Sequence, residues 1–275
     1  MSRPPVALTI AGSDPSGGAG VQADLKTFSA LGVYGTSVIT ALTAQNTLGV
    51  TGVHVVPTEF VTQQLETLIA DVHLDAIKIG MLANAGIVVA VGDFLRRHPH
   101  ELVVLDPVMV ATSGDRLLDD DAVQAMRDLM PLASLVTPNL AESAALLDTR
   151  PARTLAEMRR QAMALQELGA PRVLIKGGHR EDDKEAVDLL LDVDGETLLR
   201  APRVDTINTH GTGCTLSSAL AALRPQRGSW VEAAADAKSW LTAALAAADV
   251  LEVGHGHGPA HHFHEIWSDQ PRALE

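Results

Sequence analysis

Several residue types are scarce in this chain of 275 residues, and each scarcity excludes a class of protein. The only cysteine is Cys214, so no disulfide can form within the chain, and a reducing, cytoplasmic environment is expected. Aromatic residues make up only 3% of the chain. No apolar run reaches the roughly 18 residues that a membrane-spanning helix needs. The first residues show no apolar stretch of the kind found in secretion signals.

Positive charge is also scarce. The chain has 21 Lys and Arg against 34 Asp and Glu, which gives a formal net charge of −13. This balance argues against nucleic acid or an anionic membrane as a partner. A small anionic ligand remains compatible with it, because backbone dipoles and a metal ion can outweigh the overall field locally.

The residues that are abundant predict an α/β protein. Hydrophobic residues make up 46% of the chain, and apolar runs alternate with segments of helical spacing. This order predicts a mainly parallel central sheet with helices on both faces, in a single domain over 1–275 with loose ends at 1–5 and 266–275. Asp194-Gly195 predicts a hairpin between the last two strands. We predict strands at 6–10, 34–44, 50–56, 76–79, 102–105, 135–137, 172–175, 186–192 and 196–199, and helices at 21–31, 58–71, 85–97, 120–129, 141–147, 154–168, 215–223 and 230–250.

The stretch Asn208-Thr209-His210-Gly211-Thr212-Gly213-Cys214 has the composition of an anion-binding loop. Its glycines let backbone N–H groups turn toward one point, and a helix-forming run follows it. The first turn of a helix leaves N–H groups unpaired and carries about half a positive charge. The sequence therefore predicts a phosphate site here, with an ordinary glycine loop before a buried helix as the alternative.

A second glycine loop, residues 12–20, follows the first predicted strand. A strand, a glycine loop and a helix in this order also occur in dinucleotide-binding proteins. However, neither Gly-x-Gly-x-x-Gly nor Gly-Lys-Ser/Thr can be written over it, which disfavours a dehydrogenase. Polar residues follow other predicted strands as well, and the carboxyl ends of parallel strands are where ligands bind.

Seven motifs occur in one order along the chain. They are Gly-Ser-Asp-Pro-Ser-Gly-Gly-Ala-Gly (12–20), Gln-Ala-Asp-Leu-Lys-Thr (22–27), Lys-Ile-Gly-Met-Leu (78–82), Asp-Pro-Val-Met (106–109), Thr-Pro-Asn-Leu-Ala-Glu (137–142), Lys-Gly-Gly-His (176–179) and His-Gly-Thr-Gly-Cys-Thr-Leu-Ser (210–217). Together they closely resemble the hydroxymethylpyrimidine/phosphomethylpyrimidine kinases of thiamine biosynthesis, within the ribokinase-like superfamily. The resemblance extends from about residue 8 to residue 264 and implies a three-layer α/β/α fold.

The resemblance implies a homodimeric enzyme that uses ATP and Mg²⁺ and acts twice. It would phosphorylate 4-amino-5-hydroxymethyl-2-methylpyrimidine on its hydroxymethyl oxygen, and then convert the monophosphate to the diphosphate. The nearest alternative is a pyridoxal or pyridoxine kinase, whose substrate is also a ring with a hydroxymethyl group. A different class, a non-catalytic sensor of the pyrimidine, is disfavoured because the acids, the lysine and the glycine loop of a kinase are present.

Gln45 is the expected reader of the substrate ring, since its amide offers an acceptor and a donor side by side to an aminopyrimidine. A loop-capping amide is the alternative. The resemblance places Asp24 near the substrate hydroxyl; otherwise Asp24 is simply an acid in the first turn of a helix. The resemblance also assigns four more residues to the substrate side: Gly12, Ala19, Met81 and Val108.

The nucleotide side follows from the same resemblance. Asp106 and Glu142 are expected to hold Mg²⁺ through water, and Lys176 to meet the ATP phosphates. Asn139 would lie beside Glu142; the alternative is a helix cap at Asn139 with a solvated Glu142. A surface lysine is the alternative for Lys176, and Lys238 could face either the site or solvent. The remaining ATP-binding residues are Thr209, Gly211, Thr212 and Gly213, of which Gly211 and Gly213 are also expected to act in catalysis together with Lys176 and Cys214.

Cys214 departs from the sugar kinases of the superfamily, which carry an Asp base at this position. A helix N-terminus is expected to lower the pKa of this thiol, so it could serve as a base. Our hypothesis is that a switchable thiol, unlike a fixed carboxylate, tolerates a phosphate as the second acceptor. A small buried cysteine without a role is the alternative.

The tail contains histidines separated by glycines, Gly254-His255-Gly256-His257-Gly258-Pro259, followed by His261, His262 and His264. A transition-metal site is one interpretation, although no cysteine joins the cluster. We favour a docked terminal segment.

Overall fold

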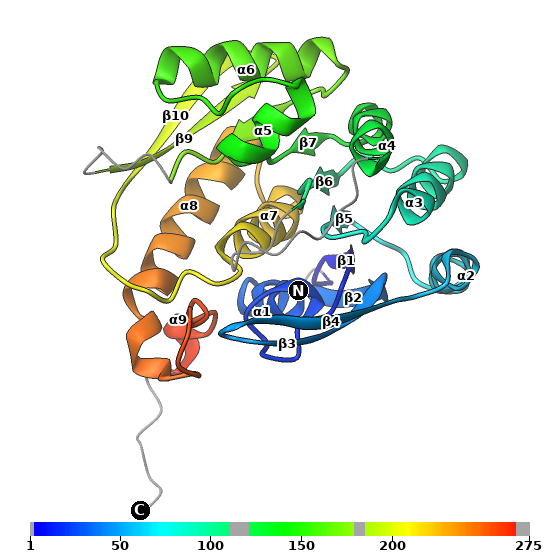
Figure 1. Cartoon of the computed structure of the whole chain (residues 1–275), viewed down its shortest axis with the longest axis horizontal. Helices are drawn as coiled ribbons and strands as arrows, with labels where there is room; N and C mark the ends of the chain where they lie inside the picture. Colours follow the sequence, from blue (N-terminus) through cyan, green and yellow to red (C-terminus); the bar gives the residue numbers. More distant parts are fainter. Residues whose placement is uncertain (1–2, 110–120, 179–184, 268–275) are drawn as a thin grey trace, which may run out of the picture.

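The computed structural model describes residues 3–109, 121–178 and 185–267. A central sheet of eight strands runs through this part of the chain (Figure 1). Its order is β10 (Gly195–Pro202), β9 (Glu185–Asp192), β8 (Val173–Ile175), β7 (Leu135–Val136), β6 (Val103–Leu105), β5 (Ala76–Ile79), β1 (Val6–Ala11) and β2 (Tyr34–Ile39). Strands β8 to β2 pair in parallel, whereas β9 is antiparallel to both of its neighbours. The predicted mainly parallel sheet and its terminal hairpin are confirmed.

Helices cover both faces of this sheet. On one face lie α1 (Gly20–Ala30), α7 (Thr212–Leu223) and α8 (Trp230–Ala246). On the other lie α2 (Thr58–Ile69), α3 (Ala85–Arg97), α4 (Asp121–Leu129), α5 (Leu140–Leu147) and α6 (Leu155–Glu167). Shorter helical turns are η1 (Met130–Leu132), η2 (Arg224–Gln226), η3 (Ala248–Leu251) and α9 (His264–Trp267).

Successive side chains of a strand point to opposite faces of the sheet. Because helices cover both faces, the side chains on both are buried. In β5, Ile77 and Ile79 pack into the core beneath α2 to α6, while Ala76 packs into the core beneath α1, α7 and α8. The strands therefore appear in the sequence as short continuous apolar runs. Within the described residues, none of the helices is long and apolar enough to cross a membrane.

The predicted strand 34–44 is wrong, because the chain leaves the central sheet at Thr40. There the Thr40 N–H donates to the Ala11 carbonyl at 3.0 Å and the Thr40 hydroxyl donates to the Met81 carbonyl at 2.7 Å. The next residues form β3 (Ala41–Asn46), which pairs antiparallel with β4 (Gly49–Val55) in a separate two-stranded sheet. This turn carries Gln45 over the carboxyl ends of the parallel strands.

Most other predicted elements agree with the structure to within a few residues, and the strand 76–79 and the helix 85–97 agree fully. The helix predicted at 230–250 ends earlier, at Ala246, and continues as η3. The sequence also predicts a loop at Ser113-Gly114-Asp115 before the helix at 120–129. This loop and the first residue of that helix lie outside the described residues.

Candidate active site

The anion loop, residues 208–214, lies at the carboxyl edge of the central sheet and leads into α7. Gly211 caps this helix with a φ of 70°, and a Cβ atom there would fall 1.9 Å from the Gly18 carbonyl oxygen. Only glycine permits so close an approach between the two glycine loops. The loops 12–20 and 208–214 are therefore in direct backbone contact with each other.

The backbone of the anion loop is available for a ligand. Among the described residues, nothing accepts a hydrogen bond from the N–H groups of Gly211, Gly213 and Cys214. These groups belong to the cap and first turn of α7, where the helix dipole adds positive potential. The arrangement is that of an anion site at a helix N-terminus.

One end of the anion loop lies beside a cluster of charges. The Lys176 Nζ donates to Asp106 Oδ1 at 2.6 Å and lies 3.7 Å from Glu142 Oε2. A Cβ atom on Gly213 would lie 3.2 Å from the same Nζ. Lys176 is therefore not a surface lysine: its side chain is 13% exposed and lies against the anion loop.

Burial and charge together set the ionisation of this cluster. Burial raises the pKa of Glu142 to about 7. The positive charge of Lys176 lowers this pKa, and the negative charge of Asp106 raises it further. Burial lowers the pKa of Lys176, but Asp106 and Glu142 outweigh burial and raise it. Ser217 of α7 donates to Asp106 Oδ2 at 3.2 Å, which fixes the carboxylate toward the start of that helix.

Asn139 and Glu142 cap α5 reciprocally. Asn139 Oδ1 accepts from the Glu142 N–H at 2.8 Å, and Glu142 Oε2 accepts from the Asn139 N–H at 2.7 Å. The cap alternative is thus correct for Asn139, but a solvated Glu142 is wrong, because this residue is 6% exposed. A bridge between Asn139 and Lys176 keeps the capped helix start next to the lysine.

The other end of the anion loop lies beside Gln45. The Gln45 amide is 3.3 Å from His210 Nε2, and the same ring nitrogen is 2.8 Å from Asp14 Oδ2. Gln45 and Lys176 therefore lie at opposite ends of residues 210–213. The pairing of His210 with Asp14 was not predicted from the sequence, although both residues belong to the seven motifs.

The other expected substrate residues lie along the same edge. The Gly12 N–H donates to the Met81 carbonyl at 3.1 Å, and a Cβ atom on Gly12 would meet Met81 Cε at 2.5 Å. The Ala19 N–H donates to Asp14 Oδ2 at 2.8 Å. Val108 lies on the Asp106 side, with its N–H donating to the Asp106 carbonyl at 2.8 Å.

The two threonines of the anion loop contact each other. The Thr212 hydroxyl donates to the Thr209 carbonyl at 2.6 Å, which tightens the turn ahead of α7. Thr209 is exposed and Thr212 is half-buried. Both side chains lie at the edge of the loop rather than beneath it.

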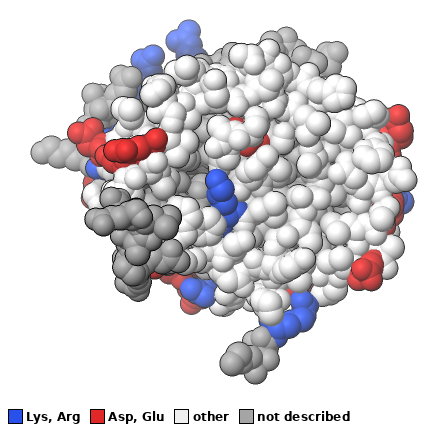
Figure 2. Space-filling view, turned by 90° about the horizontal axis from the view of Figure 1, so that it is seen from below, with Lys and Arg blue, Asp and Glu red and all other residues white. Residues whose placement is uncertain are grey.

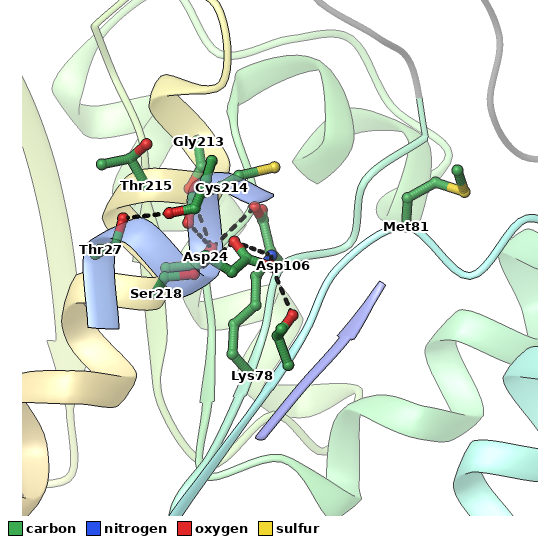
Figure 3. Close-up of polar contacts among 12 residues, drawn as sticks. Asp24, Thr27, Lys78, Met81, Asp106, Gly213, Cys214, Thr215 and Ser218 are labelled. Atoms are coloured by element: carbon green, nitrogen blue, oxygen red, sulfur yellow. Dashed lines mark hydrogen bonds and ion pairs between the residues drawn. The ribbon is translucent and has the colours of Figure 1, made fainter. Parts of the chain in front are cut away.

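Asp24 lies beneath the anion loop and is fully buried, with 0% exposure. It accepts from Lys78 Nζ at 2.8 Å and from Ser218 at 2.6 Å (Figure 3). It also accepts from the Thr9 hydroxyl at 2.6 Å. The first-turn alternative is wrong, because no acid lies in the first turn of α1. The position of Asp24 favours a supporting role under Cys214 over direct contact with a substrate.

The buried position of Lys78 was likewise not predicted from the sequence. Lys78 is 0% exposed and lies in β5 among apolar residues. Burial lowers its pKa, but the surrounding acidic groups, Asp24 foremost, together outweigh burial and raise it. A lone lysine within an otherwise apolar strand was the available signal for a buried ion pair.

Cys214 is half-buried in the first turn of α7, and the expected lowering of its pKa is wrong. Burial raises the pKa of the thiol to about 11, opposed by Lys78 and assisted by Asp24 and Asp106. The helix dipole is outweighed because the thiol faces two carboxylates and a low-dielectric interior. The side chain is a neutral thiol at neutral pH.

Lys238 does not extend into solvent. Its Nζ donates to Asp188 Oδ2 at 2.7 Å, and Asp188 Oδ1 accepts from the Gly177 N–H at 2.9 Å. Lys238 thus supports the turn that follows Lys176.

The tail docks against both halves of the site, as favoured from the sequence. The His257 N–H donates to the Thr47 carbonyl at 3.1 Å, and the His210 N–H donates to the Gly258 carbonyl at 3.0 Å. His261 and His262 are buried. Within the described residues, His, Cys, Asp and Glu do not form a group of three or more that could hold a metal ion, which gives the metal interpretation no support.

A parallel sheet with helices on both faces, an anion loop at a helix N-terminus, and a lysine with two acids beside it define a phosphotransferase that acts on small molecules. Comparison with known proteins agrees. Residues 14–261 match the family model described as phosphomethylpyrimidine kinase. This chain belongs to the phosphomethylpyrimidine kinase family.

Individual relatives cover almost the whole chain. The hydroxymethylpyrimidine/phosphomethylpyrimidine kinase of Salmonella typhimurium is 59% identical over 262 residues, which are 95% of this chain and 98% of that protein. The phosphomethylpyrimidine kinase of Clostridium difficile has a solved structure with a TM-score of 0.77 and 38% identity, covering 86% of this chain and 98% of its own. A Bacillus subtilis pyridoxal kinase solved with ADP has a TM-score of 0.87 and 36% identity, covering 95% of this chain and 98% of its own.

Proposed function

We propose that this protein transfers the γ-phosphoryl group of ATP to the hydroxymethyl oxygen of 4-amino-5-hydroxymethyl-2-methylpyrimidine, and then a second phosphoryl group to the resulting monophosphate. The diphosphate serves thiamine biosynthesis. The observation that carries the proposal is the anion loop, which begins beside Gln45 and reaches Lys176 at Gly213. An acceptor ring held at Gln45 would meet the terminal phosphoryl group over this loop.

The chain's residues would contribute mainly position and charge. Phosphoryl transfer develops charge on the equatorial oxygens, and the N–H groups of Gly211, Gly213 and Cys214 are suited to stabilise it. Lys176 would neutralise the phosphates of ATP, with Asn139, Thr209 and Thr212 completing the nucleotide site. Cys214 would lie beside the transferred phosphoryl group as a neutral thiol.

Mg²⁺ fits the acids beside Lys176. Asp106 and Glu142 supply carboxylate oxygens, the donors that Mg²⁺ prefers, and both are buried near the anion loop. Asp106 already accepts from Lys176 at 2.6 Å and from Ser217 at 3.2 Å, so these acids suit an ion held through water. When bound, Mg²⁺ would neutralise phosphate charge.

We further propose that residues 1–275 form one kinase domain that assembles as a homodimer. The sheet β3–β4 and its surroundings expose several large apolar side chains, namely Tyr34, Leu42, Leu48, Val53, Val55 and Phe60. The face seen from this side carries few Lys, Arg, Asp or Glu residues (Figure 2). A weakly charged face with exposed apolar residues favours association with a second copy.

Pyridoxal is the second candidate acceptor, because the Bacillus subtilis pyridoxal kinase shares the fold at 36% identity. Gln45 favours the aminopyrimidine, since an amide pairs with an amine and an adjacent ring nitrogen. Direct competition between the two substrates would rank them.

The decisive experiment incubates the protein with Mg·ATP and hydroxymethylpyrimidine and follows the products by mass. We expect the monophosphate first and the diphosphate later, with one ADP released at each step. The Lys176→Met variant should lose at least about a hundredfold in kcat/KM, because a charge that stabilises the transferred group is removed. Binding of the pyrimidine without ADP release would contradict the proposal and indicate a sensor.

A further inference from the structure

The side-chain amide of Gln45 lies between two polar groups on the substrate side of the site. Its Oε1 position is 3.1 Å from Thr43 Oγ1, and its Nε2 position is 3.3 Å from His210 Nε2. The oxygen and nitrogen of an amide have nearly the same shape, so the hydrogen-bonding groups around it decide which atom occupies which position.

The amide atom of Gln45 that faces the Thr43 hydroxyl must be a hydrogen-bond donor. The Thr43 hydroxyl has a single hydrogen, and it lies 2.8 Å from the Ser13 carbonyl, which can only accept. The hydroxyl must therefore donate to Ser13 and can only accept from Gln45. An amide oxygen at this position would leave two acceptors facing each other, whereas the amide nitrogen satisfies both.

The amide atom of Gln45 that faces His210 Nε2 must be a hydrogen-bond acceptor. Burial raises the pKa of Asp14, but hydrogen bonds from His210 and Ser16 outweigh it and keep this pKa below its usual value. Asp14 is therefore an ionised acceptor, and His210 Nε2, at 2.8 Å, must carry the proton that bonds to it. An amide nitrogen at this position would place a second N–H donor against the N–H of His210. An amide oxygen there accepts a hydrogen bond from the same N–H that also bonds to Asp14.

Both sides are satisfied by the same arrangement of the amide. We propose that His210, oriented by Asp14, is a positioning residue that holds Gln45 with its oxygen toward His210 and its nitrogen toward Thr43. This leaves one lone pair on the oxygen and one N–H on the nitrogen for a ligand. They match the amine and the adjacent ring nitrogen of a 4-aminopyrimidine, so His210 sets the preference for the amine. The inference rests on the proposed function.

The surroundings hold His210 rigidly enough for this task. Its side chain is 9% exposed and that of Asp14 is 2% exposed. Its backbone N–H donates to the Gly258 carbonyl at 3.0 Å, and its ring packs so closely on Gly18 that a Cβ atom there would lie 2.4 Å from His210 Cδ2. The ring therefore keeps one orientation.

The test compares two substrates in three variants. The substrates are the 4-aminopyrimidine alcohol and its analogue with hydrogen in place of the amine. His210→Leu removes the donor, His210→Gln restores an N–H, and His255→Leu, on an exposed histidine of the tail, is the matched control. We expect His210→Leu to reduce the preference for the amine, measured as a ratio of kcat/KM, by about tenfold, the scale of one hydrogen bond. KM for the amine substrate should carry the change, and His210→Gln should recover part of it.

Each outcome is decisive. An unchanged preference in an active His210→Leu variant, or an equal loss with both substrates, overturns the inference alone. A wild-type protein without activity on the pyrimidine overturns the proposed function and the inference with it. Should His210→Leu fail to fold, Thr43→Val tests the other side of the amide and should weaken the same preference. A neutron structure of the wild type gives a direct view: deuterium on the amide atom facing Thr43 supports the inference, and deuterium on the atom facing His210 overturns it.

Discussion

At the scale of single residues, the environment of a side chain matters more here than its type. Cys214 follows a glycine loop at a helix N-terminus, which predicts an acidic thiol. The structure places the thiol beside Asp24 and Asp106 in a buried site, which raises its pKa to about 11. The two carboxylates come from distant parts of the chain, so local sequence could not reveal this reversal.

The pKa of Cys214 can be tested by alkylation. Because the thiolate is the reactive form and the raised pKa keeps it a small fraction below pH 9, the rate with iodoacetamide should rise about tenfold for each pH unit from 7 to 9. A small-molecule thiol of ordinary pKa, measured alongside, should begin to level off near pH 8.5. A levelling of the protein's own rate in that range would contradict the raised pKa.

Replacement of Cys214 by Asp tests why a thiol stands there. A carboxylate beside the acceptor should repel the phosphate of the second substrate more than the neutral alcohol of the first. In the Cys214→Asp variant, kcat/KM for the second phosphorylation should therefore fall at least about tenfold further than that for the first. Equal effects on the two steps would show that acceptor charge is not the reason for the thiol.

At the scale of elements, the tail connects the two halves of the site. Gly256 lies against the turn between β3 and β4, where a Cβ atom would fall 2.0 Å from the Thr47 carbonyl oxygen. Two residues later the tail meets the anion loop through the bond from His210 to Gly258. Cβ atoms on Gly254 and Gly258 would fall 2.2 Å from the Thr47 side chain and 2.0 Å from the Asn208 side chain. Close contacts thus explain the alternating glycines, and the histidines between them need no metal.

Gly256→Ala should separate these elements. The added methyl group meets backbone that cannot rotate away, so we expect a loss of about 1–3 kcal/mol in the free energy of unfolding. KM for the pyrimidine should rise as well, because Thr47 is two residues from Gln45. Thermal unfolding and steady-state kinetics would measure the two effects, with exposed His255→Ala as the control. A variant as stable and active as wild type would show that the tail does not hold the hairpin.

At the scale of the whole molecule, one buried ion pair joins the central sheet to a helical layer. Lys78 of β5 and Asp24 of α1 are both 0% exposed, and Ser218 of α7 completes the contact. Within this core, the pair holds α1 and α7 together beneath Cys214, where the anion loop ends in the first turn of α7 (Figure 3). The geometry of the site therefore depends on a contact below it.

Breaking this pair should destabilise the fold strongly. Asp24→Leu leaves the Lys78 charge buried without its partner, so we expect a loss of about 3–5 kcal/mol in the free energy of unfolding by urea. The double variant Asp24→Leu/Lys78→Met should recover part of that loss, since no uncompensated charge remains. A single variant that loses less than about 1 kcal/mol would mean that water reaches the lysine.

The sequence by itself determined the layered fold, the order of most elements, and the motifs that gather at the strand ends. It could do so because apolar periodicity and turn residues act over a few neighbouring positions. Only the tertiary structure decided that the strand predicted at 34–44 breaks at Thr40, that Asp24 pairs with Lys78, that Cys214 stays neutral, and that His210 lies between Asp14 and Gln45. Each of these depends on charges and donors brought together from remote parts of the chain, and their energies follow from distance and burial in space.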